Sequence, residues 1–502
     1  MNIIHGDCLE ELKKLEDNSI DAVVCDPPYG LSNTKPQQVA DVLKAWVAGD
    51  TVSVPAKRGG FMGADWDSFV PPPAVWEECM RVLKPGGHMA VFAGARTQDL
   101  MGLSIRLAGF EIRDTLGWVY SQGFPKSMDI SKAIDKGQGL SRSRAYEFTE
   151  WMRSTGIKER EICEATGTAM MGGHFLAGPN HSQPAIATAD LFDKLRPLLP
   201  EVPERIERLV AERTGIEWAD YVKREVVGKY QSGLHTGPSG VGGHGEGGEV
   251  TTSHSDAAKQ WDGWGTALKP AIEPIILARK PLDGTVANNV LAHGVGGLNI
   301  DACRVPSDEI TGWGGAGAGG QTWNSENMRL GKDGDARPVQ GRFPANVLLD
   351  EHAAKEMDKQ SGNRRGFAGG GDTPGEVGND VYGKGWKRNE NPQYYSDEGG
   401  ASRFFPVFKY QAKAPKKERP VIEREDGTKI QHNTVKPLAL MEWLVSLIVP
   451  PGGVVLDPFA GSGTTLQAAL NKGFTPIGIE QDADYIKLIE KRLEATCTTH
   501  KN

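Results

Sequence analysis

A carboxylate, two prolines and an aromatic ring directly follow a short apolar run, and this feature constrains the fold more than any other. The run is Ala22 to Cys25, and the tetrapeptide is Asp26, Pro27, Pro28 and Tyr29. A short apolar run bounded by proline and glycine predicts a buried parallel strand. Ligands of open α/β sheets bind outside the carboxyl ends of strands. We therefore expect Asp26 and Tyr29 to face a cleft.

The tetrapeptide suits attack by an exocyclic amino group on an electrophile. The nitrogen of such a group is a poor nucleophile, because its lone pair is delocalised into the ring. The carboxylate of Asp26 and the carbonyl of Pro27 can accept its N–H groups, while Tyr29 stacks on the flat base. Acceptors that match the transition state better than the ground state lower the barrier. The alternative is a proline-rich turn that only caps a strand.

A second motif lies near the far end of the chain. Residues 453–465 have the pattern of a strand, a glycine turn and the start of a helix, and Thr464 or Thr465 is expected to cap that helix. Residues 475–480 then form a second short strand that ends in an acid, Glu480, suited to binding ribose hydroxyls. Together with the tetrapeptide, the glycine turn and the acid point to a nucleotide-like cofactor.

With both motifs present, the chain resembles the amino DNA methyltransferases that use S-adenosylmethionine. Their hallmarks are an Asp-Pro-Pro-Tyr catalytic motif, here Asp26 to Tyr29, and a Phe-x-Gly-x-Gly cofactor loop, here Phe459 to Gly463. The catalytic motif comes first, which is similar to the permuted β group of the family. Residues 432–437 are similar to the family's His-Pro-Thr-x-Lys-Pro element beside the methionine end of the cofactor, with Asn433 in place of the first proline.

The resemblance implies a set of site residues and one cofactor, S-adenosylmethionine, with no metal. The catalytic residues that it implies are Asp26, Pro27, Pro28 and Tyr29. Asp7 is expected beside the adenine of the cofactor. The other cofactor-binding residues that it implies are His432, Thr434, Lys436, Asp457, Pro458, Phe459, Ala460, Gly461, Ser462, Gly463, Thr464 and Glu480.

The resemblance further implies methylation of adenine N6 at a specific site in double-stranded DNA. That nitrogen is hidden in the duplex, so the base must be flipped out, at a cost of a few kcal/mol. Methylation of cytosine N4 uses the same geometry, although the Asp before Pro-Pro-Tyr favours adenine in this family. A DNA-binding protein that has lost catalysis is an alternative of another class. An RNA or protein amide substrate fits less well, given the long insert.

Composition bounds these interpretations. At 502 residues the chain is expected to form two or three domains. A formal net charge of −8 argues mildly against a large nucleic-acid footprint, although a local basic patch remains compatible with it. The six cysteines are scattered and form no Cys-x-x-Cys pair, so we expect reduced thiols and no zinc site. Without an apolar signal or a membrane-length apolar run, a soluble cytoplasmic protein is expected.

The predicted fold class is α/β, with a doubly wound, mostly parallel Rossmann-like sheet, an antiparallel edge pair and a large inserted recognition region. Alternating strands and helices imply the parallel sheet. We expect the catalytic half at 1–120, a helical insert at 121–265, a return strand at 266–281, a loop-rich insert at 282–401 and the cofactor half at 402–502. The return strand is expected to pair with the segment that ends at Tyr120.

Contacts with DNA are predicted in several segments. Residues 403–419 are locally basic, and we take Lys409, Lys413, Lys416 and Lys417 as candidate phosphate contacts, with a basic linker as the alternative. Residues 158–168 have the pattern of the first helix and turn of a helix-turn-helix, which a generic helical hairpin shares. The basic loop within residues 31–67 can close on DNA or be an ordered surface loop. Residues 201–229 are expected to be helical with a solvated charged face.

The expected partners follow from the family resemblance. Double-stranded DNA is the substrate, and a homodimer and a cognate restriction endonuclease are both compatible with the sequence. The target sequence is not encoded in any motif, because it depends on side chains in the irregular inserts.

Overall fold

The computed structural model describes most of the chain. The described residues are 2–32, 34–55, 67–121, 123, 127–131, 133–134, 142–168, 171–178, 184–214, 226–229, 249–251, 256–313, 337–365, 398–408, 419–424, 426–432 and 434–499. The chain forms two compact units, residues 1–123 together with 271–502, and residues 124–270.

A mixed sheet is the centre of the first unit. Among the described residues it has nine strands in the order β1-β17-β16-β2-β3-β7-β4-β10-β13. Strand β7 runs antiparallel to β3 and β4, and the other paired neighbours in the described part of this sheet are parallel. The strands are β1 Asn2–His5, β2 Ile20–Cys25, β3 Leu83–Phe92, β4 Glu111–Val119, β7 Ile272–Arg279, β10 Val347–Asp350, β13 Val407–Phe408, β16 Val454–Asp457 and β17 Thr475–Glu480.

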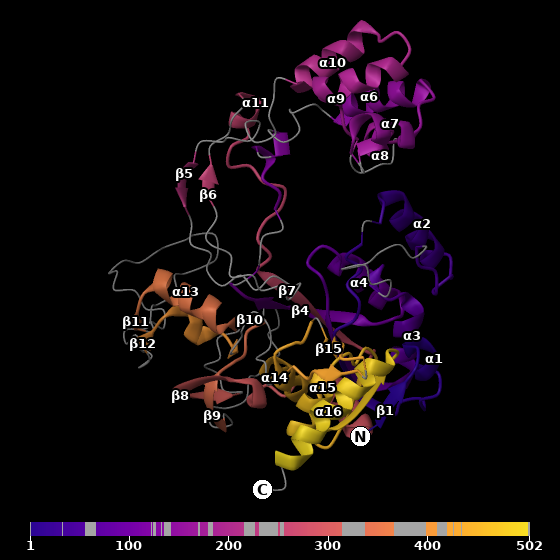
Figure 1. Cartoon of the computed structure of the whole chain (residues 1–502). Helices are drawn as coiled ribbons and strands as arrows, with labels where there is room; N and C mark the ends of the chain where they lie inside the picture. Colours follow the sequence, from indigo (N-terminus) through magenta and orange to yellow (C-terminus); the bar gives the residue numbers. More distant parts are fainter. Residues whose placement is uncertain are drawn as a thin grey trace, which may run out of the picture. The chain divides into compact units, whose positions relative to one another are not determined.

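Helices cover both faces of this sheet (Figure 1). Side chains alternate along β2, so Val23 and Cys25 pack into one apolar cluster, whereas Ala22 and Val24 pack into the other. This explains why β2 is buried along its whole length. The helices of this unit are α1 Cys8–Leu12, α2 Pro36–Val47, α3 Pro73–Val82, α4 Gln98–Leu107, α12 Val286–His293, α13 Glu351–Ser361, α14 Leu438–Ile448, α15 Thr464–Asn471 and α16 Ala483–Thr499.

Shorter elements complete the first unit. Strands β8 Val305–Trp313 and β9 Arg337–Arg342 pair with each other, as do β11 Arg364–Arg365 with β12 Glu398–Gly399, and β14 Ile422–Glu423 with β15 Lys429–Ile430. Two 3-10 turns also belong to this unit: η4 Asp301–Cys303 directly precedes β8, and η5 Ala401–Phe404 follows β12.

The predicted fold class is confirmed, with one difference in the antiparallel pair. Strands β4 and β7 pair as expected, with Val119 opposite Ile272 and Leu116 opposite Ile275. The pair is not at the edge, because β10 pairs with β4 and β13 pairs with β10. These two added strands have only four and two residues, too few to show a strand pattern in a loop-rich segment.

The second unit is mainly helical. Its helices are α6 Arg142–Ser154, α7 Glu159–Thr166, α8 Met171–Phe175, α9 Ala189–Leu195, η3 Arg196–Leu198, α10 Glu204–Thr214 and α11 Asp256–Lys259. Phe148 packs against Phe175 and Phe192 at its centre. After α7 the chain turns at Gly167, which has a φ of 72°, and α8 follows with only five residues.

The expectation of a helix throughout residues 201–229 is wrong in its last part. Residues 226–229 form strand β5, which pairs antiparallel with β6, Glu249–Thr251. Two adjacent valines followed by a glycine favour extended backbone, which outweighs the charge pattern of the preceding helix.

The described part of the chain shows neither a membrane-spanning helix nor a clustered metal site. None of its helices combines the length and apolar character needed to cross a membrane. The same residues contain no group of three or more His, Cys, Asp or Glu side chains arranged to hold a metal ion.

Candidate active site

Acidic side chains follow several parallel strands where these end. Asp26 comes directly after β2, Asp457 ends β16 and Glu480 ends β17, while Asp7 lies two residues beyond β1. Because β1, β17, β16 and β2 are parallel neighbours, these carboxylates lie along one edge of the sheet. The sequence-predicted catalytic and cofactor motifs therefore meet, although they are separated by most of the chain.

Four side chains form a hydrogen-bonded cluster at this edge, which we call the Asp26 cluster: Asp26, Tyr29, Glu273 and Lys436. The Tyr29 hydroxyl donates to Oδ1 of Asp26 at 2.7 Å. The Lys436 ammonium donates to Oδ2 of Asp26 at 2.7 Å and to the Tyr29 hydroxyl at 3.0 Å. Oε2 of Glu273 lies 3.4 Å from the Lys436 ammonium and 3.5 Å from the Tyr29 hydroxyl oxygen.

The charges of this cluster are set by burial and by the two carboxylates. Burial lowers the pKa of Lys436, but Asp26 and Glu273 raise it more, so the net pKa is above its usual value and the side chain stays cationic. Burial, followed by the charges of Asp26 and Glu273, raises the pKa of Tyr29 well above its usual value. The phenol therefore remains neutral and serves as a hydrogen-bond donor.

The Lys436 ammonium also lies near two aromatic faces. Its nitrogen is 5.3 Å from the ring centroid of Tyr29 and 4.9 Å from that of Phe92. A cation at such a distance is attracted by the ring quadrupole. The same surroundings, a flat ring and a carboxylate acceptor, suit a planar base that carries an amino group.

The loop that holds Tyr29 is fixed by residues that the sequence did not single out for this role. Oδ1 of Asp67 accepts from the backbone N–H of Tyr29 at 2.7 Å and of Gly30 at 3.0 Å. The Thr97 hydroxyl donates to the Tyr29 carbonyl at 2.6 Å. Gly30 has a φ of 67°, and a Cβ there would lie 2.7 Å from the Val70 nitrogen. The loop is thus held by buried polar contacts and closely packed backbone.

The glycine loop after β16 differs from expectation at the helix start. Gly463, with a φ of 77°, is the N-cap residue of α15, so neither Thr464 nor Thr465 caps the helix. The reason is that the chain enters α15 through a left-handed turn, which places both threonines inside the first turn. Thr465 instead hydrogen-bonds to Asp457. The loop is also held by Arg492, whose Nε donates to the Ser462 carbonyl at 2.7 Å.

Glu480 and His432 both approach Gly461 in this loop. Oε2 of Glu480 accepts from the Gly461 N–H at 2.8 Å. A Cβ on Gly461, which has a φ of 53°, would lie 3.0 Å from Nε2 of His432. Burial lowers the pKa of His432, so its imidazole is neutral. His432 also packs edge-on against Tyr485 of α16 at 4.8 Å between ring centroids. Its position beside Gly461 brings the segment that leads to Lys436 next to the glycine loop.

The remaining predicted cofactor residues are distributed along the same edge. Asp7 is exposed and caps α1, accepting from the N–H groups of Leu9 and Glu10. Phe459 packs against Trp76 with ring centroids 6.1 Å apart. Pro458 and Ala460 are buried, whereas Thr434 is exposed. These placements do not test binding, and the cofactor roles of these residues stay predictions.

The acidic edge fits S-adenosylmethionine chemically. The cofactor carries a sulfonium and an ammonium group, and Asp457 and Glu480 place carboxyl groups at the ends of neighbouring strands. The absence of a side chain on Gly461 keeps the backbone open beside His432. The residues present therefore match a cationic nucleoside.

Asp457 gives a pH-dependent prediction that needs no ligand. It is 3% exposed, and burial raises its pKa to about 7, an effect partly offset by hydrogen bonds from Thr465 and the Phe459 N–H. Because its folded pKa lies above the unfolded value, its favourable contribution is complete below about pH 4 and is lost as pH rises towards 7. Between pH 5 and pH 8 we expect the free energy of unfolding of the wild type to fall by on the order of 2 kcal/mol relative to that of Asp457→Asn, which has no carboxyl group to ionise.

Denaturant unfolding of both proteins at pH 5 and pH 8 measures this difference. The wild type is expected to lose stability relative to Asp457→Asn as pH rises. A constant difference across this range would contradict the raised pKa.

Some predicted contacts with DNA cannot be placed. Lys409, Lys413, Lys416 and Lys417 lie outside the described residues, as do residues 56–66 of the basic loop and Asn433.

Glu273 of the Asp26 cluster was not predicted as a site residue, although the sequence contained a signal for its position. A strand antiparallel to the segment ending at Tyr120 must begin at the carboxyl edge of the sheet, so the acid near its start belongs there.

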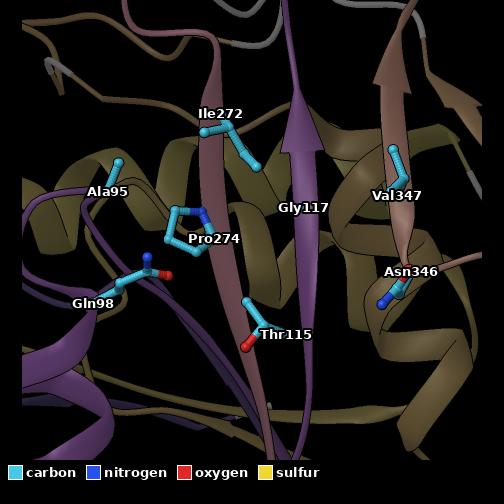
Figure 2. A pocket seen from close by; sticks show the side chains of 8 residues that line it. All are labelled: Ala95, Gln98, Thr115, Gly117, Ile272, Pro274, Asn346 and Val347. Carbon is cyan, nitrogen blue, oxygen red and sulfur yellow. The ribbon is translucent and has the colours of Figure 1, made fainter.

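A hollow lies on the face of β7 that is opposite to Glu273 and the Asp26 cluster. Its volume is about 250 Å³, and Figure 2 shows its lining: Ala95, Gln98, Thr115, Gly117, Ile272, Pro274, Asn346 and Val347. Ile272 and Pro274 alternate with Glu273 along β7, so they point away from the Asp26 cluster. The hollow is therefore a separate feature of the sheet.

Comparison with known protein families shows the family to which the chain belongs. The family described as DNA methylase, of the N6/N4 type, matches residues 20–188 and 265–491. The chain belongs to the N6/N4 DNA methylase family. Its cofactor is S-adenosylmethionine, as the family resemblance implied. The matched residues include the Asp26 cluster and the glycine loop, and the unmatched residues 189–264 fall within the second unit.

Curated relatives of this N6/N4 DNA methylase match it over short stretches. They include the type II methyltransferase M2.DpnII of Streptococcus pneumoniae, 41% identical over 70 residues, which are 14% of this chain and 26% of the relative. DNA adenine methyltransferase YhdJ of Escherichia coli K12 is 46% identical over 63 residues, 12% of this chain and 21% of the relative. The chain thus spans only 21–26% of the length of these relatives.

Solved structures resemble the methylase more weakly. The M1.HpyAVI-SAM complex has a TM-score of 0.32 at 13% identity, covering 98% of both chains. The cytosine-N4-specific PvuII DNA methyltransferase has a TM-score of 0.34 at 11% identity, covering 98% of this chain and 85% of the other. Scores this low carry no argument about activity.

Proposed function

We propose that this chain is a site-specific DNA methyltransferase that transfers a methyl group from S-adenosylmethionine to N6 of adenine. The observation that carries the proposal is the Asp26 carboxylate. It lies at the end of β2, held by Tyr29 and Lys436, beside the strand that leads into the glycine loop. This arrangement places a hydrogen-bond acceptor for an amino group next to the predicted cofactor loop.

The chain's own residues position the reacting nitrogen. Oδ2 of Asp26 and the Pro27 carbonyl accept the two N–H groups of the amino group and favour a localised lone pair. Tyr29 stacks on the flipped base and offsets part of the cost of flipping, which is about a few kcal/mol. S-adenosylmethionine supplies the electrophilic methyl group. Direct displacement needs no enzyme nucleophile, and burial raises the pKa of the Cys25 thiol well above its usual value.

The cofactor is proposed to lie along the acidic edge. Asp7 is assigned to the adenine, Glu480 to the ribose hydroxyls and residues 457–464 to the loop that approaches the cofactor backbone. His432, Thr434 and Lys436 are assigned to the methionine end. Glu480 can accept further hydrogen bonds because each of its oxygens receives one backbone N–H in the structure.

Adenine is favoured over cytosine by two observations. Asp, rather than Ser, precedes Pro-Pro-Tyr, and one curated relative is named as an adenine methyltransferase. The family itself includes both N6 and N4 enzymes. Cytosine N4 methylation is therefore the second candidate, because the Asp26 cluster can hold either amino group.

Double-stranded DNA is the proposed partner, read by the inserts at 121–265 and 282–401. Within the second unit several arginines are paired with acids, such as Arg196 with Glu207 and Arg144 with Glu212. These pairs favour contacts through shape and base edges over a broad phosphate-binding surface. A cytoplasmic location, a homodimer and a cognate endonuclease stay predictions.

The test is incubation with tritiated S-adenosylmethionine and unmethylated genomic DNA, followed by nucleoside analysis and single-molecule sequencing. Label in N6-methyladenine within one short motif is the expected result. Label in N4-methylcytosine would keep the mechanism and change the base. Cofactor binding without any label on DNA would contradict the proposal and favour a non-catalytic DNA-binding protein.

A further inference from the structure

Both oxygens of the Asp26 carboxylate are already in use in this structure. Oδ1 accepts from the Tyr29 hydroxyl, and Oδ2 accepts from the Lys436 ammonium, each at 2.7 Å. The ammonium also lies 5.3 Å from the centre of the Tyr29 ring. Lys436 therefore occupies the place, between acceptor and aromatic face, that the proposed substrate's amino group needs.

Displacing this ammonium is costly unless another anion receives it. The Lys436 side chain is 12% exposed. A buried charge that loses its partner is strongly destabilising. Glu273 provides a second carboxylate, with Oε2 already 3.4 Å from the ammonium and 28% side-chain exposure. This distance is only about 0.5 Å longer than that of a normal N–H···O hydrogen bond.

The position of Glu273 is set by the sheet and not by a flexible loop. It is the second residue of β7, where it pairs with Trp118 of β4. Glu273, Ile275 and Leu277 point to the same face of β7, and the latter two pack in the cluster that includes α14. Lys436 lies two residues before α14 on that face. The sheet thus holds the second carboxylate beside the lysine.

We propose that Glu273 is a positioning residue that receives the Lys436 ammonium when the target amino group takes its place on Oδ2 of Asp26. The inference rests on the proposed methyltransferase function. The exchange breaks the hydrogen bond from Lys436 to Asp26 and forms one from Lys436 to Glu273, while an amino N–H donates to Asp26. The lysine keeps its three protons throughout, and the cluster keeps its net charge.

The test compares wild type with Glu273→Gln, which keeps the size of the side chain and removes its charge. Two duplexes containing the mapped target are used, one with the intact base and one with an abasic site at that position. For the intact duplex we expect kcat/KM to fall about tenfold or more, with weaker binding of the DNA. The abasic duplex has no amino group that displaces Lys436, so both proteins are expected to bind it equally.

Two control variants separate positioning from a general structural effect. Glu111→Gln removes a carboxylate from the other end of the same strand pair, where Glu111 accepts a hydrogen bond from Arg279 at 2.7 Å. This variant is expected to keep the wild-type kcat/KM and the wild-type affinity for both duplexes. Glu273→Asp keeps the charge and is expected to restore part of kcat/KM. Affinity for S-adenosylmethionine is expected to stay within about twofold for the Glu273 and Glu111 variants, since the residues assigned to the cofactor are unchanged in them.

A double-mutant cycle with Lys436→Met completes the test. Once the ammonium is gone, Glu273→Gln is expected to have little further effect on kcat/KM. Equal losses in the wild-type and Lys436→Met backgrounds, or equal losses for the intact and abasic duplexes, would overturn the inference. If the wild type methylates no DNA, the proposed function fails first, and the inference with it.

Discussion

Asp26→Ala is expected to lower kcat for methyl transfer by about 1,000-fold or more, while binding of S-adenosylmethionine is retained. The carboxylate is the acceptor that localises the lone pair of the target nitrogen, and its effect is confined to the transition state. Its removal also deprives the Tyr29 hydroxyl and the Lys436 ammonium of their 2.7 Å partner. Single-turnover methylation with saturating DNA measures the chemical step directly.

Asp41→Ala is the matched control for this change. Asp41 is an exposed acid on α2, where it accepts a hydrogen bond from Gln37, and its loss is expected to leave kcat unchanged. Thermal unfolding of both variants separates loss of chemistry from loss of fold. If Asp26→Ala retained more than about a tenth of the wild-type rate, Asp26 would not be the acceptor that the mechanism requires.

The central strands and the Asp-Pro-Pro-Tyr motif were predictable because each has its signal within a short stretch of sequence. The apolar run of β2 and the Asp-Pro-Pro-Tyr motif are adjacent in sequence, and β16 and β17 have the same strand-then-acid form. Parallel pairing then places their ends at one edge, whatever the length of the inserts between them. The family resemblance implied a place for Lys436 beside the cofactor, but it did not predict the 2.7 Å contact of its ammonium with Asp26.

Glu273 required two signals to be combined. The strand of residues 272–279 was expected to pair with β4, and its acid lies at the carboxyl edge only because it runs antiparallel. Asp67 had no such signal, since it lies 38 residues after Tyr29 and outside any strand or helix that the sequence predicted. Contacts of this kind depend on tertiary folding and not on periodicity.

The helix cap and the outer strands were missed for different reasons. Threonine is a common N-cap residue, but the left-handed backbone at Gly463 moves the start of α15 by one residue. The strands β10 and β13 are short, and pairing of β10 with β4 and of β13 with β10 fixes them as strands more than their own sequence does. The sequence motifs therefore predicted the catalytic residues better than the sequence predicted the outer strands of the sheet.

Gly461→Asp is expected to weaken S-adenosylmethionine binding at least about 100-fold, and methyl transfer at low cofactor concentration falls accordingly. A Cβ at this position lies 3.0 Å from Nε2 of His432, so the imidazole or the loop must move. The substitution also adds a negative charge to the residue whose N–H donates to Oε2 of Glu480 at 2.8 Å. Steric displacement and like-charge repulsion thus act together on the loop. Isothermal titration calorimetry with S-adenosylmethionine alone measures the loss.

Gly473→Asp is the matched control, because it carries the same substitution at another glycine with a positive φ. Gly473 has a φ of 79°, and a Cβ there meets no atom within 4 Å. Backbone strain and added charge are therefore similar in the two variants, while only Gly461→Asp crowds His432 and Glu480. Cofactor affinity is expected to stay at the wild-type level in Gly473→Asp. Equal affinity in the two variants would remove the glycine loop from the cofactor site, since strain alone would then account for any loss.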